Sequence, residues 1–109
     1  MRKSLGEQLK IDGMEQALTH ANETHENWGN LAHNFLVFYC VHKKDPFLVE
    51  EVRLASMYII PEPPSLRAWG SIVIRAAREG LVKKVGYKAV KNPRAHQTPA
   101  TLWKSLLNF

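Results

Sequence analysis

Residues 60–64, Ile-Pro-Glu-Pro-Pro, constrain the fold of this chain more than any other segment. Each proline lacks a backbone N–H donor and pushes the residue before it toward an extended conformation, so a helix cannot continue through them. The segment therefore predicts a turn between two helices. After the turn, Ser65 is a good N-cap for a helix that ends at Gly80, where Leu81 can make the apolar contact that accompanies a glycine C-cap.

Three further helical segments are expected before the proline turn. The first begins after Asp12, which can cap it in a capping box with Glu15, and it ends near His25. The second runs from Glu26 until Asp45-Pro46 stops it, and residues 49–57 form the short third helix. The residues predicted to face the core are Met14, Ala17, Leu18 and Ala21 in the first helix, Trp28, Leu31, Ala32, Phe35, Leu36 and Tyr39 in the second, and Val49, Val52 and Met57 in the third.

Beyond Gly80 the apolar residues alternate with lysines, which is typical of a half-buried strand. Residues 91–99 form a polar loop with two prolines, and residues 101–105 alternate again as a second strand. The expected fold is therefore α+β and mostly helical. Its element order is that of a winged helix-turn-helix with an extra N-terminal helix and a C-terminal β-hairpin wing. Residues 12–109 would form this domain, preceded by a flexible N-terminus at residues 1–11.

The charge of the chain is strongly polarised. Residues 1–63 hold six Lys or Arg and nine Asp or Glu, which leaves −3, whereas residues 64–109 hold nine and one, which leaves +8. Such asymmetry is typical of a surface for phosphates or for an acidic partner, although a basic surface kept only for solubility gives the same count.

Two basic surfaces are candidates for binding nucleic acid. On a helical wheel, the helix after the proline turn directs Leu66, Trp69, Ile72, Val73, Ala76, Ala77 and Gly80 to the core, and the opposite face would meet a major groove. That face carries Arg67, Ser71, Ile74, Arg75 and Arg78. An isoleucine at the centre of an exposed basic face has no role in solubility, so it could contact a thymine methyl or a partner protein. The second surface is the wing, with Lys83, Lys84, Lys88, Lys91, Arg94 and His96.

Catalytic and metal-binding motifs are not found in the sequence. The five histidines offer no i, i+4 ligand pair, and no phosphate-binding glycine loop, nucleophile elbow or paired-carboxylate motif is present. The single cysteine, Cys40, is interpreted as a small buried thiol. We therefore expect a protein that is not an enzyme and has no metal or cofactor. No apolar run could cross a membrane and no signal core follows Met1, so a cytoplasmic location is expected.

Several segments resemble a group of small winged-helix proteins that are encoded in bacteriophages and prophages. They are residues 12–21, 51–53, 63–70 and 76–81, together with the late His96, Pro99 and Trp103. Within residues 63–70, Pro-Pro-x-x-Arg-Ala-Trp-Gly is the most distinctive motif. The resemblance covers residues 12–104 and implies a phage setting, with a role in DNA replication or gene control.

Two hypotheses about function follow. The first is a non-enzymatic winged helix that binds nucleic acid, most simply duplex DNA. The second is a protein-interaction module that binds a host or phage replication or transcription protein with the same surface, because one fold serves both uses. A homodimer is compatible with either hypothesis, and neither involves a membrane.

Overall fold

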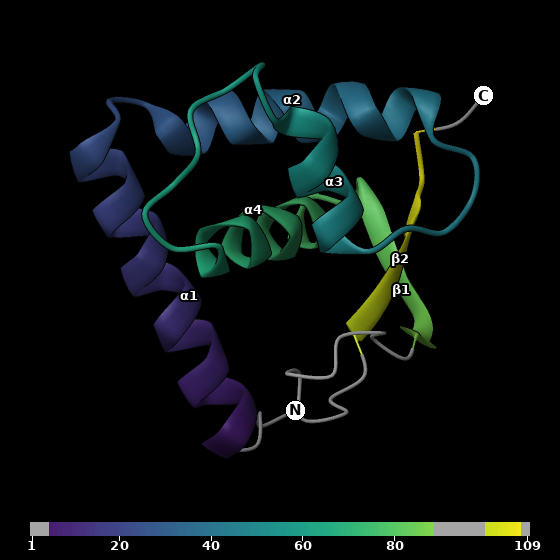
Figure 1. Ribbon diagram of the computed structural model, residues 1–109. Coiled ribbons are helices and arrows are strands. Elements are labelled where there is room, and N and C mark those ends of the chain that lie inside the picture. Colours follow the sequence, from purple (N-terminus) through teal and green to yellow (C-terminus); the bar gives the residue numbers. More distant parts are fainter. Residues whose placement is uncertain (1–4, 89–99, 108–109) are drawn as a thin grey trace.

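Four helices and one antiparallel hairpin make up the computed structural model, which describes residues 5–88 and 100–107, with side chains from Ile11 onward (Figure 1). The expected class, α+β and mostly helical, is confirmed. In chain order the elements are α1 (Leu5–Thr24), α2 (Trp28–His42), α3 (Val49–Ser56), α4 (Arg67–Arg78), β1 (Val82–Lys88) and β2 (Ala100–Ser105).

Helix α4 lies at the centre of the molecule and is contacted by α1, α2, α3 and β1 (Figure 1). Its core-facing residues are Ala68, Trp69, Ile72, Val73 and Ala76. The Trp69 ring packs edge-on against Trp28, with 5.3 Å between the ring centroids, and against Phe35 at 6.4 Å. These aromatic contacts join α4 to α2 and form the centre of the core.

Both ends of α4 follow from local sequence. The helix begins at Arg67 with Leu66 at the N-cap, one residue after the predicted cap Ser65, although the Ser65 hydroxyl still accepts a hydrogen bond from the backbone N–H of Arg67 at 3.3 Å. At the other end Gly80 adopts a φ of 77°, and the N–H of Leu81 donates to the carbonyl of Ala76 at 2.9 Å. The predicted stop at Gly80 is confirmed, because this left-handed turn with a six-to-one hydrogen bond is the glycine-terminated helix end.

The hairpin is attached to the helices through β2. Strands β1 and β2 are antiparallel, with Val82 opposite Ser105 and Lys83 opposite Lys104. On the other edge of β2, Phe47 and Trp103 exchange two backbone hydrogen bonds of 2.8 Å each. The Ser105 hydroxyl donates to the carbonyl of Cys40 in α2 at 2.7 Å. The sheet therefore includes one residue from the segment between α2 and α3.

The N-terminal helix differs from its prediction. Helix α1 begins at Leu5, so Asp12 lies inside the helix rather than at its cap. A capping pattern of Asp followed by Glu three residues later is also acceptable within an exposed helix face, which is why the sequence was misleading here. Helix α2 begins at Trp28 instead of Glu26, and the Asn22 side chain of α1 accepts a 2.8 Å hydrogen bond from the N–H of Gly29.

Four residues that were predicted to face the core are exposed: Leu31 (41%), Met57 (43%), Leu66 (48%) and Gly80. Helix α2 is apolar on nearly every face, so periodicity alone assigned it too wide a core stripe. The stripe that is fully buried there runs along Ala32, Leu36 and Cys40, and the prediction of a buried Cys40 is confirmed. Among the described residues, no helix is both long and apolar enough to traverse a lipid bilayer.

Candidate functional site

The outer face of α4 carries the five residues that the helical wheel assigned to it. Arg67, Arg75 and Arg78 are exposed, whereas Ser71 and Ile74 are half-buried. Ile74 packs against the core cluster. It is therefore not the free apolar residue on an open basic face that the sequence suggested.

Helix α1 is the reason for this burial, because it packs along the outer face of α4. Small residues recur on α1 at Gly13, Ala17 and Ala21, of which the two alanines are buried. A Cβ atom added to Gly13 would lie 3.6 Å from a guanidinium nitrogen of Arg67, and one added to Gly70 would lie 2.8 Å from the Met14 methyl group. The two helices therefore approach each other closely, and α4 is enclosed on a side that the sequence left open.

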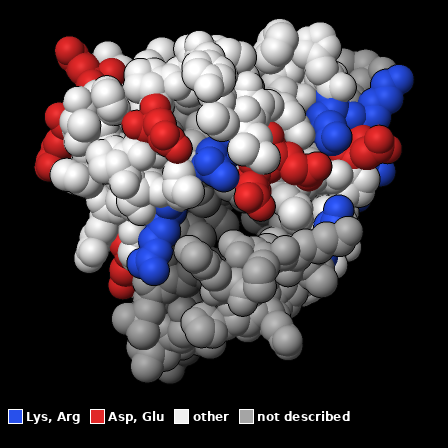
Figure 2. Space-filling model, viewed as in Figure 1, with Lys and Arg blue, Asp and Glu red and all other residues white. Residues whose placement is uncertain are grey.

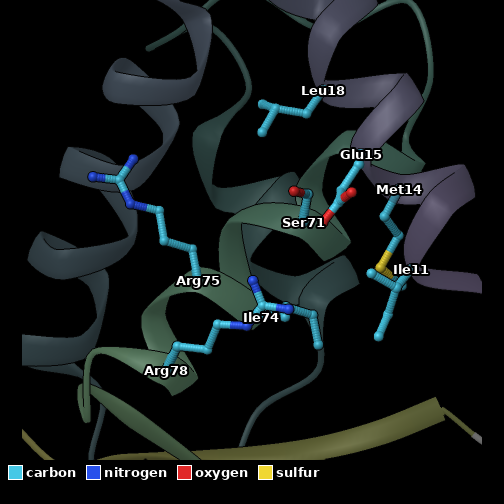
Figure 3. Close-up of a pocket in the computed structure, with 8 residues that line it drawn as sticks. All are labelled: Ile11, Met14, Glu15, Leu18, Ser71, Ile74, Arg75 and Arg78. Carbon is cyan, nitrogen blue, oxygen red and sulfur yellow. The ribbon is translucent and has the colours of Figure 1, made fainter. Parts of the chain in front are cut away.

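Toward the C-terminal end of α4 the two helices leave a pocket of about 220 Å³ between them (Figure 3). Within the pocket Glu15 extends from α1 toward Ser71, and Arg78 lies on the side of Ile74 (Figure 3). Arg75 points away, toward α2. The lining residues are Ile11, Met14, Glu15, Leu18, Ser71, Ile74, Arg75 and Arg78.

Arg75 already has an anionic partner. Its Nε donates to Oε1 of Glu79 at 3.2 Å, and Nε2 of His33 lies 3.0 Å from the same carboxylate oxygen. Glu79 is the sole carboxylate side chain of residues 64–109 in the sequence. Because this carboxylate neutralises part of the charge of Arg75, Arg67 and Arg78 are the arginines of α4 better placed to attract a further anion.

The described part of the hairpin is strongly basic. Lys83, Lys84 and Lys88 are exposed, as predicted for a binding surface, and neither strand contains Asp or Glu. Lys83 is directly opposite Lys104, which sequence reasoning missed as a site residue although the alternation of residues 101–105 could have indicated it. Lys84 differs from the others, because its ammonium group contacts the Tyr87 hydroxyl and lies 4.3 Å from the centre of the Tyr87 ring.

The charges are not distributed evenly over the surface. Figure 2 shows acidic and basic side chains mixed on the face that carries α3. A polyanion would find alternating signs there, so this face is a weaker candidate than the hairpin. The remaining predicted residues, Lys91, Arg94 and His96, lie outside the described residues.

The described residues include no group of three or more His, Cys, Asp or Glu side chains that could hold a metal ion. Burial raises the pKa of the Cys40 thiol. A side-chain hydrogen bond with Ser105 lowers this pKa, but by less than burial raises it. A buried thiol that resists ionisation is a poor nucleophile. Burial also raises the pKa of the Tyr39 hydroxyl, and the nearby Glu51 carboxylate adds to the shift.

Comparisons with protein-family models, curated proteins and solved structures found no match for this chain.

Proposed function

We propose that the chain is a winged helix-turn-helix domain that binds nucleic acid without catalysing a reaction. The arrangement of elements supports the assignment. Helices α2, α3 and α4 are followed by a hairpin, and the strand-like residue Phe47 between α2 and α3 pairs with the second strand of that hairpin. This is the order of a winged helix, with α1 as an addition at the N-terminus.

The observation that carries the binding proposal is the pair of lysines across the hairpin. Two like charges directly opposite each other on a sheet are destabilising unless something of opposite charge lies near them. Lys83 and Lys104 form such a pair, and Lys84 and Lys88 are further exposed lysines on β1. A phosphate backbone supplies the missing negative charge, and most of the affinity of proteins for duplex DNA comes from such contacts.

Recognition of base sequence by α4 is a separate matter. Ser71 and Ile74 face α1, so the outer face of α4 could enter a major groove only after α1 had moved. The proposal therefore assigns phosphate binding to the hairpin lysines and to Arg78. Along with it we propose the phage setting, in which the protein would act in DNA replication or gene control in the cytoplasm of the host.

The alternative, a module that binds a host or phage protein with the same surface, drew part of its support from an exposed Ile74. Because Ile74 is half-buried against the core, that support is removed, and the hairpin surface favours a polyanion.

Fluorescence anisotropy with a labelled DNA duplex over a range of salt concentrations tests the proposal. Each phosphate contact contributes about −0.9 to the slope of log affinity against log salt, so K83A/K104A should make that slope shallower by up to about two units. The matched control is K43A/K44A, which removes the same charge from the loop after α2 and should change the slope little. An unchanged slope in the hairpin variant, or an equal loss in both variants, would contradict the proposal.

A further inference from the structure

Helix α2 is unusual because none of its 15 residues is Asp, Glu, Lys or Arg. A helix that is apolar on all faces is normally buried on all faces. Here one face, with Trp28, Leu36 and Cys40, is buried in the core, but the opposite face is exposed. Phe38 is 62% exposed there, which is a large apolar area to leave in water.

Four of the exposed residues of α2 lie in a seam, which we define as Leu31, Asn34, Phe38 and Val41. Their spacings are three, four and three, which is the spacing of the core positions in a two-stranded coiled coil. The order is also symmetrical about Leu36. If two such helices run antiparallel, Leu31 of one lies beside Val41 of the other, and Asn34 lies beside Phe38.

The charge of the molecule indicates what covers this seam. Helix α2 contains no Asp, Glu, Lys or Arg, so two copies of the chain can pair through it without bringing like charges of that helix together. A nucleic acid gains nothing electrostatic from an uncharged face. Antiparallel pairing also places the positive end of each helix dipole beside the negative end of the other.

We propose that the seam on α2 is a homodimer interface in which two copies of this chain pair through antiparallel α2 helices. A twofold interface brings the same surface of both copies together, and the symmetrical spacing of the seam allows its four positions to meet in this way. Helix α2 lies beside α4 (Figure 1), and its buried residues are on the side of the core, so the seam lies on the opposite side of α2. Pairing of the seam would therefore leave the pocket between α1 and α4 uncovered.

The length of α2 limits the size of the interface. A helix of 15 residues is about 22 Å long, so one pair of such helices makes an interface at the small end of the usual range. We expect a reversible dimer with a dissociation constant on the order of 10 μM.

Sedimentation equilibrium of the full chain between about 1 and 500 μM tests the proposal, because that range spans the expected dissociation constant. The wild type should change from monomer to dimer, and F38E should stay monomeric, since a buried carboxylate opposite Asn34 has no cationic partner. The control is I59E, which places the same charge on a residue that is 66% exposed outside α2 and should dimerise like the wild type.

A charge pair tests the antiparallel arrangement. L31K alone and V41E alone should each weaken dimerisation by at least tenfold. In L31K/V41E the introduced lysine of one copy would lie beside the introduced glutamate of the other, so the double variant should regain the dimer. In a parallel pair the same double variant would bring like charges together and lose it.

A wild type that remains monomeric at 500 μM, or a dimer that F38E does not weaken, would overturn the proposal. So would failure of L31K/V41E to recover the dimer while its circular dichroism matches that of the wild type. These outcomes do not depend on DNA binding, so the interface and the proposed function can fail separately.

Discussion

Individual aromatic side chains hold the helices of this protein together. Trp69 is only 1% exposed and contacts rings of α2, whereas Trp28 contributes both a ring and a hydrogen bond. The indole N–H of Trp28 donates to the carbonyl of Pro61 at 2.8 Å. This bond attaches the proline turn to α2, and it satisfies a carbonyl that the prolines leave without a helical partner.

Replacement of Trp69 with alanine should unfold most of the protein. Loss of a buried indole typically costs about 3–5 kcal/mol, which is comparable to the total stability of about 5–15 kcal/mol for a small domain. Circular dichroism during thermal unfolding measures the effect, with I59E as an exposed apolar control that should melt near the wild type. A Trp69→Ala protein with an unchanged melting temperature would show that the ring is not part of the core.

At the scale of elements, the ends and contacts of α4 decide where its side chains point. The C-terminal end depends on Gly80, which adopts a left-handed backbone conformation, and a Cβ atom there would meet no other atom within 4 Å. Any cost of substitution at this position is therefore conformational rather than steric. Which face of α4 is exposed to solvent depends instead on α1, because α1 packs closely against α4 at Gly70.

Gly80→Ala should destabilise the protein by about 1 kcal/mol, because alanine is strained at a positive φ. Gly80→Asn should cost less, since asparagine tolerates the left-handed region better than alanine does. Urea unfolding of the two variants beside the wild type measures the difference. Equal stability of all three proteins would mean that α4 does not end in a left-handed turn at this residue.

At the scale of the whole molecule, α4 is the element that joins the others. It contacts α1, α2, α3 and β1, while α1 contacts the fold through α2 and α4. Opening of α4 should therefore require opening of the whole core, whereas α1 has fewer partners and can open more readily. The enclosure of Ser71 and Ile74 depends on α1, whose main partner is α4.

Native-state hydrogen exchange tests that order of stability. The amides of Ile72, Val73 and Ala76 in α4 should exchange at the rate set by global unfolding, and the amides of α1 should exchange faster because the helix can open locally. Mass spectrometry of peptic fragments or NMR of the intact chain resolves the two sets. Protection of α1 equal to that of α4 would indicate that the two helices open only together.

Much of this protein follows from its sequence alone. Proline and glycine restrict the backbone directly, so the turn at residues 60–64 and the end of α4 at Gly80 were predictable from local chemistry. The alternation of residues 82–88 and 101–105 predicted the two strands, because side chains on a strand repeat every two residues. The expected half-buried pattern of residues 82–88 is not found, since Val85 and Tyr87 are exposed and the strand register shifts between Lys84 and Gly86. The sequence also identifies the lysines of residues 83–88 as a basic surface, but it does not show which lysines lie opposite each other.

Only the tertiary structure decided which faces stay open. A helical wheel shows which residues share a face, but it does not show which other elements pack against the helix. In this protein α1 packs against the face of α4 that the wheel left open. Ile74 is half-buried for that reason, and Leu31 is exposed because α2 has more apolar faces than the core of one copy can cover. The opposition of Lys83 and Lys104 likewise required the register of the two strands, which no local pattern specifies.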